Sequence, residues 1–192
     1  MVRDDTHWLS IIDRFTAAAL DGIGWQEALT ALAAATGSRT AQLCGEVTTG
    51  AAEFNFITEF DPAALAEMPD AGAGDPSLNT RLQVGARLPV LQVFADGDFL
   101  SKEARRANRF YSDFSVRYDI PFSCQTSVVK ANGAWIGLAV IRSRRQGEIG
   151  ARERALFASI APHVRAAVQT HLALEQQGAL LLAGALERIS LA

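Results

Sequence analysis

The stretch from Pro121 to Arg142 reads PFSCQTSVVKANGAWIGLAVIR, with one apolar run on each side of Asn132-Gly133. An Asn-Gly pair between two such runs is the strongest short-range signal for a β-hairpin, because both residues tolerate positive φ angles. We therefore predict strands over residues 121–130 and 135–142. The second run is almost continuously apolar, which is typical of a strand at the centre of a sheet.

A second hairpin and two helices are predicted upstream of this stretch. Apolar and polar residues alternate from Arg39 to Val47, a turn follows around Gly50, and residues 53–58 form a partner strand. Helical spacing predicts helices over residues 4–20 and 25–36. The residues expected to face the core from these two helices are Trp8, Ile11, Ile12, Phe15, Ala19, Trp25, Leu29, Leu32 and Ala33.

The pattern is weaker in the middle of the chain. Asp61-Pro62 is typical of a helix start, and Ser101 followed by Glu103 also favours one. Leu88, Val90, Leu91 and Val93 suggest a short strand. The elements predicted here are a helix over 61–68, a strand over 87–94, and helical segments over 102–110 and 111–118.

The last predicted element is a helix from about Gly150 to Ile189, roughly 60 Å long if it is unbroken. Pro162 removes one internal hydrogen bond, so we expect a bend there, with the part before it on the sheet and the part after it leaving the domain. Apolar residues recur at spacings of three and four, as in a coiled coil. We predict dimerisation through Ile160, Val164, Ala167, His171, Leu174 and Leu181.

Composition indicates one folded domain. The chain has 192 residues, 49% of them apolar and 20% charged, and its net charge of −3 gives no general attraction to nucleic acid. No signal peptide and no membrane span is found, so a cytoplasmic location is expected. We predict a sensory domain over residues 1–175 and a helical extension over 176–192.

The sequence offers few groups for catalysis. None of the common nucleophile or phosphate-loop motifs occurs, and Cys44 and Cys124 are too far apart for a zinc or disulfide pattern. We therefore expect no catalytic site, no metal and no cofactor. Aromatic residues gather instead around the predicted sheet, where they either wall a ligand pocket or fill the core. The predicted ligand-binding residues are Phe54, Phe56, Phe110, Tyr111, Phe114 and Trp135.

Several short phrases, in their order along residues 8–175, resemble the N-terminal sensory region of LuxR-type helix-turn-helix transcriptional regulators. The phrases are FTAAALD (15–21), WQEAL (25–29), DP (75–76), RFYSDF (109–114), IR (141–142), ARERAL (151–156) and IAPHVRAA (160–167).

The resemblance implies an α+β fold that is GAF-like or PAS-like, with a central antiparallel sheet flanked by helices and a long C-terminal helix. In that family the helix-turn-helix follows near the C-terminus, and we expect this chain, which ends at Ala192, to be a fragment of such a regulator or to work by another route. DNA binding is therefore expected only through a module absent from this chain. The WxxxYxxD arrangement of the acyl-homoserine-lactone-binding branch is missing, so an autoinducer is not the expected ligand.

Three functional hypotheses follow. The leading one is a regulatory domain of a transcriptional regulator that senses an unknown small molecule and forms a homodimer. The second is a protein–protein interaction and dimerisation domain with a filled core and no ligand. The third is an enzyme that uses Cys124 or the region of Tyr111.

Overall fold

A computed structural model of the chain describes residues 2–47, 54–131 and 134–190. The strands are β1 (Thr40–Val47), β2 (Phe54–Ile57), β3 (Phe94–Ala95), β4 (Phe122–Ala131) and β5 (Ala134–Arg142). The helices are α1 (Val2–Asp21), α2 (Trp25–Ala35), α3 (Pro62–Glu67), α4 (Thr80–Arg87), α5 (Lys102–Ala107), α6 (Ser115–Arg117) and α7 (Ala151–Ser190). Two short helical turns complete the order. They are the 3₁₀ turn η1 (Asp96–Asp98), which is tighter than an α-helix, and the π-helical turn η2 (Phe110–Phe114), which is wider.

The strands form one antiparallel sheet in the order β2-β1-β5-β4-β3. Both predicted hairpins are confirmed, and β5 lies at the centre as its apolar run predicts. Asn132-Gly133 and the turn expected around Gly50 lie outside the described residues. A register shift between Ser127 and Val129 makes a bulge in β4, which increases the local twist of the strand.

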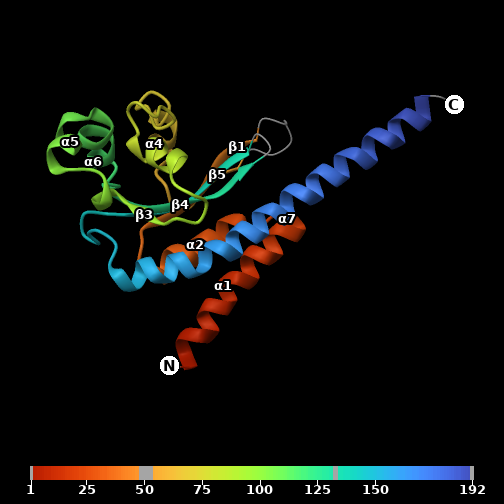
Figure 1. Cartoon of the computed structure of the whole chain (residues 1–192), viewed down its shortest axis with the longest axis horizontal. Coiled ribbons are helices and arrows are strands. Elements are labelled where there is room, and N and C mark those ends of the chain that lie inside the picture. Colours follow the sequence, from red (N-terminus) through yellow and green to blue (C-terminus); the bar gives the residue numbers. More distant parts are fainter. Residues whose placement is uncertain (1, 48–53, 132–133, 191–192) are drawn as a thin grey trace.

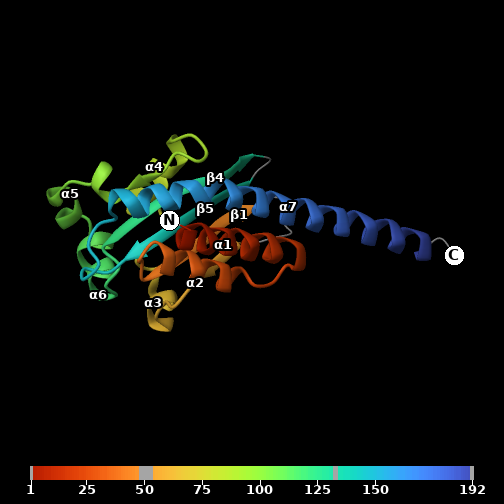
Figure 2. The ribbon, with the colours of Figure 1, turned by 90° about the horizontal axis from the view of Figure 1, so that it is seen from below.

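One face of the sheet is covered by α2 and α7, and α1 packs against both of these helices (Figures 1 and 2). Ile136, Leu138 and Val140 of β5 point to this face and are fully buried among the helices. The predicted stripes of the two N-terminal helices are confirmed, since Phe15, Trp25, Leu29 and Leu32 are also buried. α1 is joined to α7 by Trp8, whose Nε1 donates to Ser159 Oγ over 3.2 Å.

The other face is covered by the middle of the chain, which contains α3 to α6 (Figure 1). The predicted helix starts are confirmed: Asp61 Oδ1 accepts from Ala63 N over 2.8 Å, and Ser101 Oγ accepts from Ala104 N over 3.1 Å. Each bond satisfies an amide that has no partner within its own helix.

The predicted strand over residues 87–94 is wrong in most of its length, because only Phe94 pairs with β4. Pro89 has no N–H to give to a ladder, and Leu91 adopts a φ of +68°, which is incompatible with an extended strand. α4 was not predicted. Its sequence TRLQVGAR contains a glycine and too few apolar residues for a clear helical stripe.

α7 continues as one helix through Pro162 and stays in the core beyond it. Val164, Ala167 and Val168 are buried, whereas every side chain described from Ala173 onward is exposed. The predicted division at Pro162 is therefore wrong, and the helix leaves the domain about ten residues later. Pro162 itself faces solvent, so its missing hydrogen bond does not leave an unpaired carbonyl in the core.

Truncating Val164 tests where α7 leaves the core. Val164→Ala is expected to lower the free energy of unfolding by about 2 kcal/mol, because it leaves a void among fully buried side chains. Leu20→Ala, at a position 62% exposed in α1, is the control and is expected to change it by less than about 0.5 kcal/mol. Urea unfolding measures both. If Val164→Ala lowered the free energy of unfolding as little as Leu20→Ala does, α7 would leave the core at Pro162.

Candidate ligand-binding site

A cavity of about 930 Å³ lies between the sheet and the segment that covers its second face. Its floor is formed by the side chains of β1, β4 and β5 that point away from α1, α2 and α7. Its roof is formed by α3, α4 and η2, with Leu65, Leu82 and Phe114 among the lining side chains. The remaining apolar lining includes Ile57, Phe60, Met68, Phe94, Phe110, Ile120, Trp135 and Ile141.

Trp135 joins the floor of the cavity to its roof. Its Nε1 donates to Ser127 Oγ over 3.0 Å, and Ser127 Oγ donates to the carbonyl of Gly85 in α4 over 3.1 Å. A Cβ at Gly85 would stand 3.3 Å from Trp135 Cζ2 and 3.4 Å from Phe94 Cζ. α4 can approach the sheet this closely because residue 85 has no side chain.

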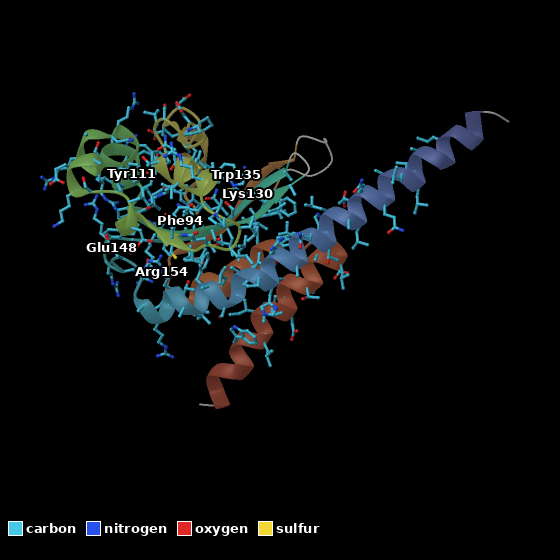
Figure 3. The ribbon with its side chains drawn as sticks, viewed as in Figure 1. Phe94, Tyr111, Lys130, Trp135, Glu148 and Arg154 are labelled. Atoms are coloured by element: carbon cyan, nitrogen blue, oxygen red, sulfur yellow. The ribbon has the colours of Figure 1, made fainter. Side chains whose placement is uncertain are left out.

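Lys130 holds the C-terminal end of α4 to β4. Its ammonium donates to the carbonyls of Ala86 and Leu88 over 2.9 and 2.6 Å, and also to that of Gly85. These carbonyls carry the negative end of the helix dipole, so a cation is the favourable partner. Figure 3 shows Lys130 and Trp135 close together on the same side of the molecule as α4.

A buried ion pair fixes the N-terminal half of α4. Arg81 Nε and Nη2 donate to the two carboxylate oxygens of Asp96 over 2.9 and 2.6 Å. Asp96 is 1% exposed and also accepts from the backbone N and the Oγ of Ser123 over 3.0 Å each. The guanidinium lies 5.3 Å from the centre of the Tyr111 ring. One carboxylate therefore ties α4, η1 and β4 together.

Two residues further on, η1 is tied to α7. Arg154, in the first turn of that helix, donates to both oxygens of Asp98 over 3.0 and 2.7 Å, and to the carbonyl of Val93 over 2.9 Å. The hydrogen bond from Arg154 lowers the pKa of the Asp98 carboxyl. Since Asp96 binds Arg81, the three residues of η1 connect the roof of the cavity to the start of α7.

Four of the six predicted ligand-binding residues border the cavity. Phe110, Phe114 and Trp135 do so clearly, and Phe54 borders it while its ring packs on Trp25 and His171 at 5.6 and 5.5 Å. Tyr111 and Phe56 do not line the cavity. Tyr111 is buried beside it, where its hydroxyl accepts from Arg81 N over 3.3 Å.

Phe56 lies on the helix-covered face, stacked on Trp25 with ring centres 6.0 Å apart. Residues two apart in a strand share a face, so Phe54 and Phe56 both point toward the helices. The floor residues that the prediction missed are the polar alternates of β1 and β4, chiefly Gln42, Cys44 and Gln125. In the sequence, these residues are marked only by the alternation of polar and apolar residues along the strand. That alternation is equally typical of a sheet face that is exposed to solvent.

The predicted dimerisation residues fall into two groups. Ile160, Val164 and Ala167 are buried in the domain core, and His171 is half-buried against Trp25 and Phe54, at 5.6 and 5.5 Å between ring centres. Leu174 and Leu181 are 42% and 68% exposed, and further leucines beside them, Leu180, Leu182 and Leu186, are exposed as well. Of the six predicted residues, only the second group is exposed in this structure.

Within residues 2–47, 54–131 and 134–190, no three His, Cys, Asp or Glu side chains are placed to hold a metal ion. In the same part of the chain, no helix has the length and hydropathy that crossing a membrane requires.

The Asp96 carboxylate is expected to be the most sensitive charge in the protein. Asp96→Asn leaves the Arg81 guanidinium buried without a counter-charge, so unfolding is expected to become easier by about 3–5 kcal/mol. Asp98→Asn removes a carboxylate that is 42% exposed and is expected to cost less than about 1 kcal/mol. Urea titration of both variants checks the ranking, and equal costs would contradict it.

Burial raises the pKa of the Cys44 thiol to about 11 and that of Cys124 to about 12. Only the thiolate is alkylated, so at pH 8 about one Cys44 in a thousand is reactive. Alkylation of Cys44 by iodoacetamide in the folded protein is expected to rise about tenfold per pH unit between 8 and 10. Cys124 is expected to react more slowly at each pH. Mass spectrometry measures both rates, and a plateau near pH 9 would contradict the raised pKa.

Comparison with known proteins identifies the fold. The sequence matches no protein-family model and no curated protein. The structure is similar to the VqsR LBD domain from Pseudomonas aeruginosa, with a TM-score of 0.63 at 16% identity over 88% of this chain and 98% of that one. It is equally similar to CepR2 from Burkholderia cenocepacia, described as an N-acylhomoserine lactone dependent LuxR family transcription factor, with a TM-score of 0.63 at 16% identity over 90% and 99% of the two chains. The chain therefore has the fold of the ligand-binding domains of LuxR-family regulators, as the sequence resemblance implies.

Proposed function

We propose that this chain is the small-molecule-sensing and dimerising regulatory domain of a transcriptional regulator. The observation that carries the proposal is the cavity of about 930 Å³ between the sheet and α3, α4 and η2. Ligand pockets commonly measure about 300–1,000 Å³ and are lined mainly by apolar and aromatic side chains with a few polar groups. The two structural neighbours named above support the proposal, since one is a ligand-binding domain and the other depends on N-acylhomoserine lactone.

On the face covered by helices, the large side chains are buried against one another. Protein interiors are packed nearly as densely as organic crystals, and voids in them forfeit dispersion contacts. The side chains of β1, β5 and β4 that line the cavity lack such contacts, and a ligand in the cavity would supply them. A ligand that binds only the folded state stabilises it by mass action.

The contacts at η1 supply a route from the ligand to α7. A ligand that presses on α4 acts on Arg81, and Arg81 is held to η1 through Asp96. η1 is in turn held to α7 through Asp98 and Arg154. A change in the position of α4 therefore reaches the helix that carries the exposed leucines.

We further propose that residues 1–175 are the sensory domain and that residues 176–192 extend toward an output module. The exposed leucines at 174, 180, 181, 182 and 186 support dimerisation through the second half of α7, because clustered apolar side chains in water favour a partner. Contact with DNA would come through the output module, and the setting would be the cytoplasm. The net charge of −3 agrees with an absence of direct DNA contact.

Filling the cavity tests the sensing function. Ala139→Phe places a ring over the floor of the cavity without touching the helix-covered face. In a thermal-shift screen against a library of metabolites, hits are expected to raise the melting temperature of the wild type and of Ala107→Phe, a control at an exposed position of α5. The same hits are expected to leave Ala139→Phe unshifted. Hits that shift Ala139→Phe equally would place their site elsewhere, and a screen without hits would favour the interaction domain with no ligand.

Sedimentation tests the dimer. A dimer at micromolar concentration is expected for the wild type, and Leu181→Glu is expected to raise its dissociation constant at least about tenfold, since a carboxylate would enter an apolar interface. Gln169→Glu is the matched control, because position 169 is exposed and lies more than one turn before the first exposed leucine of α7, Leu174. A wild type that stays monomeric at high micromolar concentration would overturn the dimer.

A further inference from the structure

Two glutamines and an alanine form a row across the floor of the cavity. The sheet register places Gln42 of β1 opposite Ala139 of β5, and Ala139 opposite Gln125 of β4. All three line the cavity. Because neighbouring strands are about 4.8 Å apart, the two glutamines start roughly 10 Å from each other with one methyl group between them. The side-chain amides of Gln42 and Gln125 therefore lie on either side of Ala139, whose side chain is a single methyl group.

The centre of the cavity floor has no large side chains because its residues are small, and not because the backbone excludes larger ones. In the adjacent row Gly137 lies between Cys44 and Ser127. A Cβ at Gly137 would meet only the carbonyl oxygens of Cys44 and Thr126, at 3.8 and 3.9 Å, which is ordinary van der Waals contact. The backbone thus tolerates a side chain at residue 137, and glycine leaves a flat strip of β5 open to the cavity.

The two amides have unused hydrogen-bonding capacity. In the part of the chain that the structure describes, the Gln42 side chain makes no hydrogen bond. Gln125 makes one long bond, from Nε2 to Ser123 Oγ over 3.4 Å. A primary amide has two donor hydrogens and an acceptor oxygen with two lone pairs. Both side chains are half-buried, so water satisfies them less fully than it does at the surface.

The cavity offers no free charge to a ligand. Among the described residues that line it, Arg81 is the one permanently charged side chain, and both carboxylate oxygens of Asp96 already bind its guanidinium. Burial keeps the Cys44 thiol neutral by raising its pKa to about 11. An ionised ligand would lose its hydration without gaining a counter-charge, which is unfavourable.

We infer that the cavity takes an uncharged ligand with a flat apolar body over Gly137 and Ala139 and a hydrogen-bonding group at each end, one for Gln42 and one for Gln125. This inference rests on the proposed sensing function and names the class of ligand for that same site. The apolar roof of α3, α4 and η2 covers the body from above, and the two amides fix its direction across the strands.

Matched naphthalene probes test the inference. Naphthalene-2,6-dicarboxamide is flat, uncharged and polar at both ends; naphthalene-2,6-dicarboxylate is the charged counterpart, and 2,6-dimethylnaphthalene is the apolar one. Titration calorimetry with the whole chain is expected to show binding of the dicarboxamide and at least tenfold weaker binding of the dicarboxylate. The side-chain NH₂ signals of Gln42 and Gln125 in NMR spectra are both expected to shift with the dicarboxamide.

Variants separate the two ends. Gln42→Leu and Gln125→Leu are each expected to weaken dicarboxamide binding by roughly 3- to 10-fold, the range for one neutral hydrogen bond. Neither is expected to weaken binding of 2,6-dimethylnaphthalene, which also shows that the variants fold. Gln169→Leu, at an exposed position of α7, is expected to change neither affinity.

Several results would overturn the inference. They are dicarboxylate binding as tight as that of the dicarboxamide, dicarboxamide affinity that is insensitive to one or both glutamine variants, and a lack of dicarboxamide binding by the wild type. If 2,6-dimethylnaphthalene still binds the wild type and fails to bind Ala139→Phe, the cavity remains a ligand site and only the amide assignment falls. If no probe binds, the inference falls, and the metabolite screen decides the sensing function separately.

Discussion

The alternation of side chains along β5 divides the molecule into a packed half and a hollow half. Ile136, Leu138 and Val140 point to one side and anchor α1, α2 and α7. Trp135, Gly137 and Ala139 point to the other, where one large residue supports α4 and two small ones leave space. Because the side-chain period of a strand is two, a shift of register by a single residue would exchange these roles. The core and the cavity therefore depend on the same constraint.

The two halves meet at η1. Asp96 faces the hollow half and binds Arg81, while Asp98 faces α7 and binds Arg154. Between them, a Cβ at Gly97 would come within 2.9 Å of the Glu148 carboxylate, so the turn is also closely packed against the loop that leads into α7. Through its two ion pairs, this turn connects the roof of the cavity to the start of the long helix.

The sequence predicted those strands and helices that a local pattern of residues determines. Asn132-Gly133 between apolar runs predicted the central hairpin, and the stripes through Phe15 and Leu29 predicted two of the covering helices. Burial by distant segments could not be predicted in the same way. The alternation at Gln42 and Gln125 is the pattern of a solvent-facing strand, and only the later segment with α4 turns that face into a floor. α4 itself is stabilised by tertiary contacts of Arg81 and Gly85, which leave no helical periodicity to detect.

The same limit explains the error at Pro162. A proline in a helix predicts a break, but the consequence depends on which side of the helix it occupies, and that side is set by α1 and the sheet. The part of α7 from residue 173 to residue 190 measures about 26 Å at 1.5 Å per residue. By this length alone, a tilt of about 10° where the helix leaves the core would displace its far end by about 4–5 Å, nearly the pitch of one helical turn. In the dimer that we propose, such a displacement would be large enough to change which side chains of the two helices meet.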